Sequence, residues 1–154
     1  MLLDQLARLL GHRTIRLTPV IDLNQTAHVD GYEHPTAVRR RTELRTHGDV
    51  FPHTATGPRA RLDHDHPTPY DRDGPPGQTG DHNDAPITRR HHRAKTHAGI
   101  GVDQIQLGVY RWTTPHGLAR MVTPTGTKTI TPITDPDGNT IGEHYDAPYR
   151  LEYA

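Results

Sequence analysis

The sequence predicts a small α+β protein, and three features of the chain support this class. Some segments carry helix start and stop signals, several shorter runs alternate between apolar and polar residues, and fourteen Pro and fourteen Gly separate them. The hydrophobic fraction is 31%, whereas average domains contain about 45–50% apolar residues when Gly is counted. A chain of 154 residues with this composition is expected to form one domain with a small core and loose flanks.

The first expected elements precede the centre of the chain. The Leu residues between positions 2 and 10 fall on one face of a helix, and Gly11 is a natural stop. Residues 14–23 alternate, which predicts a strand that Pro19 breaks or places at a sheet edge. A short basic helix is expected from Pro35 to Thr46, before an irregular segment over 50–62.

The second half of the chain predicts further short elements. We expect a strand over 62–66, a Pro- and Gly-rich loop over 67–84 and a helix over 88–97 with Thr88 as its N-cap. The runs 102–105, 108–114 and 118–123 predict β-hairpins, and 124–148 is expected to be an extended tail. The chain is therefore divided into an N-terminal linker region at 1–48, a central domain at 49–123 and a flexible tail at 124–154.

Composition excludes some classes of protein. The chain has no Cys, so disulfides and thiolate zinc sites are ruled out. Its N-terminal residues lack the basic region and the long apolar run of a signal peptide, and no stretch approaches the length that spans a membrane. We expect a cytoplasmic protein with no membrane partner.

Charge is balanced overall but uneven along the chain. The 18 Lys and Arg residues equal the 18 Asp and Glu residues in number. Basic residues gather at 39–41 and 89–95, whereas acidic residues gather at 63–84 and after 135. A basic cluster beside an acidic, His-bearing loop suits a site that holds a cation and a phosphate together, although a solvated helix face gives the same pattern.

The pair Asp65-His66 is the first candidate for chemistry. A carboxylate binds a hard divalent cation, and the adjacent imidazole points to the opposite face of a strand. An ordinary His has a pKa of about 6.5, so neutral His66 can take a proton from water near pH 7. The same dipeptide also occurs in loops without any role.

Asn83 and the basic segment supply the other candidates. Asn83 can hydrogen-bond across its loop or lend an oxygen to a cation, or it can be a simple turn former. His92 and Lys95 lie on one face of the expected helix, where one can complete a metal shell while the other meets a phosphate. The side chains expected to contact nucleic-acid phosphates are Arg89, Arg90, Arg93 and Lys95.

The chain contains thirteen His residues, which is also the composition of a protein that binds metal ions loosely through many sites. The histidines concentrate between His64 and His97. Most of the scattered ones are expected to be solvated surface residues; examples are His28, His34, His47, His116 and His144.

Taken together, these segments resemble the HNH endonuclease domain that follows the domain-of-unknown-function 222 region in a large bacterial family. The resemblance covers roughly residues 10–135 and includes the linker-like segments 19–23 and 31–35. The matching segments are 50–52 (VFP), 63–70 (DHDHPTPY), 74–79 (GPPGQT), Asn83, 89–97 (RRHHRAKTH) and 108–117 (GVYRWTTPHG). Each motif alone is weak, and their combination is specific.

The resemblance implies a ββα-metal finger (His-Me finger) with flanking β-hairpins. It further implies Asp65 and His92 as metal ligands, His66 as the general base, and Asn83 orienting the site or joining the metal shell. A carboxylate with an imidazole favours Mg²⁺, Mn²⁺ or Ni²⁺ over a closed structural zinc. The expected partner is DNA.

The chain departs from the family pattern at several positions. Family members often carry Cys pairs that bind a structural zinc, and Thr88 and His91 stand where the second pair would be. Asp84 replaces a usual Leu and Ile100 a usual Trp. The helical region expected upstream is nearly absent, so the chain is expected to be a fragment or a remnant of a longer protein.

The sequence therefore predicts a metal-dependent HNH endonuclease that hydrolyses DNA phosphodiester bonds. One alternative is a catalytically inactive nucleic-acid-binding remnant with the same basic helix. A second alternative is a histidine-rich metal-binding protein with no nucleic-acid partner.

Overall fold

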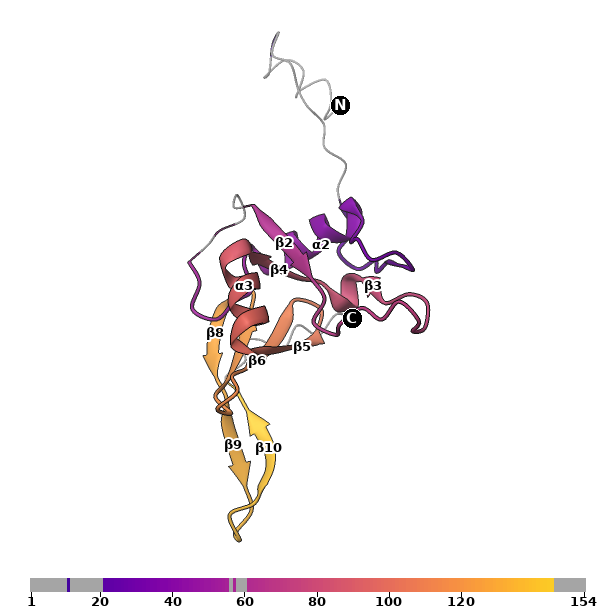
Figure 1. Cartoon of the computed structure of the whole chain (residues 1–154). Coiled ribbons are helices and arrows are strands. Elements are labelled where there is room, and N and C mark those ends of the chain that lie inside the picture. The colour runs from indigo at the N-terminus through magenta and orange to yellow at the C-terminus, as the bar shows by residue number, and fades with distance from the viewer. Residues whose placement is uncertain (1–10, 12–20, 56, 58–60, 146–154) are drawn as a thin grey trace.

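The computed structural model describes residues 11, 21–55, 57 and 61–145 (Figure 1). In this part of the chain it has two helices and several small antiparallel sheets, which confirms the predicted α+β class. The elements are β1 (His28–Val29), α2 (Thr36–Thr46), β2 (Leu62–Asp65), β3 (Thr79–Gly80), the 3₁₀ turn η1 (Asp81–Asn83), β4 (Ala85–Thr88), α3 (Arg89–Ala98), β5 (Gly101–Gln106), β6 (Val109–Thr113), β7 (Ala119–Thr123), β8 (Gly126–Thr129), β9 (Thr131–Thr134) and β10 (Thr140–His144).

Both helices that the structure describes follow the local signals of the sequence. Helix α2 begins after Pro35, whose fixed φ suits a helix start, and ends at His47 in the left-handed conformation. Helix α3 begins after Thr88, whose hydroxyl accepts a hydrogen bond from the His91 amide, and ends at Gly99 with φ +63°. The expected helix over 2–10 lies outside the described residues, as does most of the expected strand over 14–23; its described end, 21–23, forms no strand.

The centre of the fold is the antiparallel pair β2–β4 followed directly by α3. Leu62 pairs with Thr88 and Asp65 with Ala85, and α3 begins at the residue after β4, so the helix folds back against β2 (Figure 1). The expected strand over 62–66 is confirmed as β2. Strand β4 was not predicted, because a run of four residues containing Pro86 does not look like a strand.

The core lies between β4 and the four-stranded sheet β5–β6–β7–β8. The expected hairpins are confirmed, and their order in the sheet is sequential. Ile87 from β4 packs against side chains from this sheet, and Phe51 lies edge-on to Trp112 with ring centroids 5.0 Å apart. The buried cluster consists of Val50, Ala85, Ile87, Val102, Tyr110, Trp112 and Val122. It is small, as the composition requires.

The expectation of an extended tail from 124 onward is wrong for the described residues. Strand β8 completes the sheet, and β9 and β10 form a separate hairpin that projects from the body of the protein (Figure 1). Asp135 closes that hairpin by accepting hydrogen bonds from the Asn139 amide and side chain. The Thr, Pro and Gly that suggested a tail therefore form short exposed strands and a turn. Within the described residues, no helix is long and apolar enough to cross a membrane.

A buried carboxylate joins the first described segment to the centre of the fold. Asp81 in η1 accepts paired hydrogen bonds from Arg41 at 2.8 and 2.7 Å, and a third from Arg45 at 2.7 Å. The Ala27 amide donates a fourth at 2.8 Å. Asp81 is 1% exposed, so its charge depends on these partners to offset the loss of hydration.

We predict that Asp81→Asn lowers the free energy of unfolding by about 3–5 kcal/mol, because it leaves two arginines without their buried counter-ion. Urea denaturation would measure the loss. The matched control is Glu143→Gln, which breaks the more exposed pair with Arg111 and should change stability by less than about 1 kcal/mol. Equal effects of the two substitutions would contradict a structural role for the Asp81 network.

The same carboxylate gives stability a pH dependence. Burial raises the pKa of Asp81, but hydrogen bonds from Arg41, the Ala27 amide and Arg45 outweigh it and hold the pKa below the ordinary value of 3.8. This contribution is complete above pH 3.8 and is lost as the pH falls through the lower, folded-state pKa. Below about pH 4, the free energy of unfolding of the wild type should therefore fall more steeply with decreasing pH than that of Asp81→Asn.

Candidate functional site

Strand β2 carries the alternating sequence Asp63-His64-Asp65, and His66 follows at its end. Successive side chains of a strand point to opposite faces. The two aspartates accordingly contact side chains of α3, whereas the two histidines contact residues from the other side of the strand. One short strand thus presents carboxylates on one face and imidazoles on the other.

The carboxylate face brings the two sequence-predicted metal ligands together. Nε2 of His92 lies 3.5 Å from Oδ1 of Asp65. Nδ1 of His92 lies 3.1 Å from Oδ2 of Asp63, which makes the hydrogen on Nδ1 the donor. That hydrogen bond places Nε2, the other ring nitrogen, on the side of Asp65. A carboxylate behind the imidazole is how proteins commonly orient a metal-binding His.

Asp63 is a residue of this site that the sequence analysis missed. It accepts the hydrogen bond from His92 and also pairs with Arg89 at 3.0 Å. A signal was present, because Asp63 and Asp65 are two residues apart on a strand and must share a face.

The predicted nucleic-acid-binding side chains all lie on α3, but they are not equivalent. Arg90 and Arg93 are exposed. Arg89 is also exposed while its guanidinium pairs with Asp63. Lys95 is only 17% exposed, and its ammonium contacts Asp65 and the backbone oxygen of His66.

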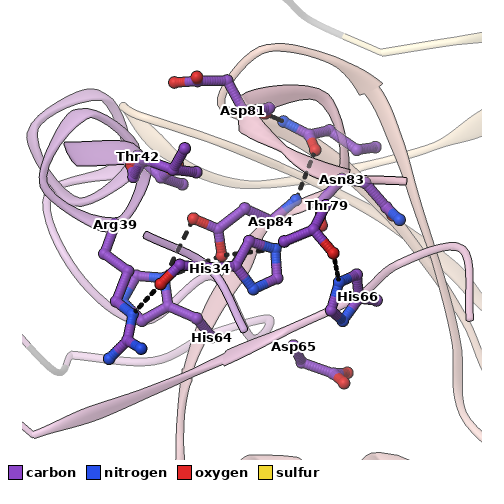
Figure 2. Close-up of polar contacts among 12 residues, drawn as sticks. His34, Arg39, Thr42, His64, Asp65, His66, Thr79, Asp81, Asn83 and Asp84 are labelled. Carbon is purple, nitrogen blue, oxygen red and sulfur yellow. Dashed lines mark hydrogen bonds and ion pairs between the residues drawn. The ribbon is translucent and has the colours of Figure 1, made fainter. Parts of the chain in front are cut away.

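His66 lies on the opposite face and is almost completely buried, at 5% exposure (Figure 2). Its Nε2 is 2.8 Å from the hydroxyl of Thr79. The rings of His34 and Tyr32 pack against it, with centroids at 4.3 and 5.3 Å. Burial, together with the nearby charge of His34, lowers the pKa of His66 to about 4. The ring is therefore neutral near pH 7, the form that can accept a proton.

Asn83 holds the loop beside His66. Its amide nitrogen donates to the backbone oxygens of Thr68 at 2.9 Å and Gln78 at 3.0 Å, and its oxygen accepts from the Thr68 amide at 2.8 Å. These contacts correspond to one of the three readings of Asn83, the one in which its side chain hydrogen-bonds across the loop. The loop was expected to have little regular structure, yet it contains β3 and η1 and is fixed by side chains.

A second group of polar side chains lies beside His66 (Figure 2). Asp84 is fully buried; its carboxylate hydrogen-bonds to His64 at 2.8 Å and lies 3.8 Å from His34. Burial lowers the pKa of His64, but hydrogen bonds to Asp84 and Glu43 outweigh it and raise the pKa above 6.5.

The expectation that His34 is a solvated surface residue is wrong. It is 3% exposed, and its Nε2 hydrogen-bonds to the backbone oxygen of Asn83 at 2.9 Å. The other four histidines expected at the surface are exposed; these are His28, His47, His116 and His144.

Asp49 fixes the start of α3, where it contacts Thr88 and His91. Its buried carboxylate accepts from the Thr88 amide at 2.9 Å and hydrogen-bonds to His91 at 2.6 Å. A third hydrogen bond comes from the Phe51 amide at 2.8 Å, and the Phe51 ring stacks on His91. A carboxylate therefore links the segment before β2 to the helix.

The described residues contain no group of three or more His, Asp and Glu side chains arranged to hold one metal ion. Any ion at Asp65 and His92 would thus have two protein ligands from this part of the chain. A cavity of about 490 Å³ lies between residues 46–57 and the β7–β8 hairpin, and none of Asp63, Asp65, His66, Asn83 or His92 lines it. Comparison with protein-family models, curated proteins and solved structures finds no match in any of the three.

We predict that Asn83→Ala lowers the free energy of unfolding by about 3 kcal/mol, since three hydrogen bonds contribute roughly 1 kcal/mol each. Hydrogen exchange at the Thr68 amide should accelerate by more than at amides of the β5–β8 sheet. As a control, Asn139→Ala removes an exposed amide from the β9–β10 turn and should have a much smaller effect. Unchanged exchange at Thr68 in Asn83→Ala would refute the proposed role of Asn83 in the loop.

Proposed function

We propose that this protein is a metal-dependent endonuclease of the HNH type that hydrolyses DNA phosphodiester bonds. The observation that carries the proposal is the placement of Asp65 opposite Nε2 of His92, with Asp63 orienting the imidazole. The order of elements also supports it. The β2–β4 pair is followed directly by α3, and this order of elements is the one that the proposed ββα-metal finger requires.

The residues present fit a divalent cation. One carboxylate oxygen and one imidazole nitrogen face each other, and the ammonium of Lys95 already rests on the same carboxylate. This donor set suits Mg²⁺, Mn²⁺ or Ni²⁺. When bound, such an ion supplies positive charge that stabilises the negative charge developing on the phosphate and the leaving oxygen.

In the proposed reaction, His66 takes a proton from the attacking water. Among the described residues its side-chain hydrogen bond is made through Nε2 alone, to Thr79. If Nε2 carries the hydrogen and donates it to the Thr79 hydroxyl, the lone pair of Nδ1 is left to accept the proton. Asn83 positions the loop next to this ring, and Arg90 and Arg93 contact phosphates of the DNA.

A second candidate function is a catalytically inactive nucleic-acid-binding protein. The observation in its favour is that His66 is only 5% exposed. If water cannot reach His66, the residue cannot act as a general base. The protein would then bind nucleic acid through the basic face of α3 without cutting it.

The test of catalysis is cleavage of supercoiled plasmid DNA with Mg²⁺, Mn²⁺, Ni²⁺ and Zn²⁺ supplied separately. We predict that the wild type nicks the plasmid with at least one ion and that His66→Ala is about 10²–10⁴-fold slower, because it lacks the general base. Higher pH should partly restore the variant, since hydroxide replaces the base.

The control for this assay is His116→Ala, which changes an exposed His in the turn after β6 and should cleave like the wild type. Circular dichroism would check that His66→Ala folds. Wild-type rates in His66→Ala would exclude His66 as the base. A wild type that binds DNA but cuts with none of the ions would favour the inactive binding protein.

We predict that DNA binding is largely electrostatic. Four side chains of α3 are expected to contact phosphates, two of them (Arg89 and Lys95) by leaving their aspartates. At about 0.9 per contact they give a slope of log affinity against log salt of roughly −3 to −4. Arg93→Gln should reduce the magnitude of the slope by about 1, whereas Arg120→Gln, on strand β7, should leave it unchanged. Affinity that barely changes between low and physiological salt would contradict this interface.

A further inference from the structure

Lys95 occupies the place where a cation would bind. Its ammonium contacts Oδ2 of Asp65 and lies 3.2 Å from the backbone oxygen of His66. Both side chains of the pair are largely buried, with 17% and 15% of their surfaces exposed. Lys95 is one of only two lysines in the chain, the other being Lys128; the remaining basic residues are arginines.

Asp65 is shared between two side chains from one face of α3. His92 approaches Oδ1 of Asp65 at 3.5 Å, while Lys95, three residues further along the helix, takes Oδ2. A divalent ion at the same carboxylate would be repelled by the ammonium, and this repulsion is strong in a partly buried site where water screens little. The ion and the ammonium therefore compete for Asp65.

The position of Lys95 also suggests where the ammonium goes when it is displaced. A lysine ammonium is a compact point charge on a flexible stem, so it can leave a carboxylate and reach a nearby anion without moving the helix. A phosphate that approaches an ion held by Asp65 and His92 would arrive on the face of α3 that carries Lys95. The released ammonium can then pair with that phosphate.

We propose that Lys95 is the built-in counter-ion of Asp65, and that a divalent ion displaces it so that it binds the DNA phosphate instead. This inference rests on the proposed function, because it takes Asp65 and His92 as the ligands. One consequence is coupling: phosphate that captures the ammonium frees Asp65 for the ion, and by thermodynamic reciprocity the ion favours phosphate binding.

The test measures Mn²⁺ affinity by calorimetry on the full chain without DNA. Lys95→Met keeps the length of the side chain and removes the competitor, so Mn²⁺ should bind about tenfold more tightly, as expected for loss of a partly buried ion pair. Lys95→Arg retains a competing charge and should stay near the wild type. Lys128→Met, the matched change at the other lysine, should have no effect. Asp65→Asn should abolish binding in the wild-type and Lys95→Met backgrounds.

Different results separate failure of this inference from failure of the proposed function. If Mn²⁺ binding depends on Asp65 but has equal affinity in the wild type and Lys95→Met, the metal site stands and the competition is overturned. If no variant binds Mn²⁺ in a manner that depends on Asp65, the proposed metal site fails and the competition fails with it.

A second measurement does not need a Lys95 variant. Reductive methylation with ¹³C-formaldehyde labels both lysines and keeps their charge. On addition of Mg²⁺, the resonance of Lys95 should shift as the ammonium leaves Asp65, while that of Lys128 should stay in place. A Lys95 resonance that remains unchanged while Mg²⁺ binds would overturn the exchange.

Discussion

The pairing of β2 with β4 is the constraint on which the site depends. Its register sets Asp65 opposite Ala85, and α3 begins at the residue that follows β4. Because side chains alternate along a strand, a slip of one residue would turn both aspartates away from the helix and both histidines toward it. Burial of Ala85 and Ile87 in the core resists that slip. The hydrogen bond from the Val50 amide to the oxygen of Pro86 holds the other side of β4.

Buried carboxylates compensate for the small apolar core. Asp81 links η1 to α2 through Arg41, Asp49 links the segment before β2 to α3, and Asp84 hydrogen-bonds to His64. Each of these carboxylates has several partners, which buried charge requires if it is not to destabilise the fold. The links surround the β2–β4 pair, and they stand in a chain that has no Cys for a disulfide or a thiolate zinc.

The sequence was sufficient to predict the elements that carry local signals and the site residues that fall within one motif. Helices α2 and α3, strand β2 and the hairpins of the four-stranded sheet all follow from caps, spacing and turns. Strand β4 was missed because Pro86 masks it, and β9–β10 because Thr, Pro and Gly also make tails. Burial of His34 could not be foreseen, since it depends on Asn83 and Asp84, about fifty residues away. The proximity of Asp65 to His92 follows from the fold, whereas the role of Asp63 follows from strand alternation.

The measurement that tests the account most directly is the position of the metal ion. A crystal of the protein with a DNA duplex and Mn²⁺, examined by anomalous diffraction at the manganese edge, locates the ion without reference to activity. The proposed metal site predicts one peak within bonding distance of the Asp65 carboxylate and Nε2 of His92, with the phosphate next to it. The proposed displacement of Lys95 predicts that its ammonium no longer contacts Asp65. A peak held by other histidines, or none at this carboxylate while DNA is bound to α3, would contradict the proposed metal site.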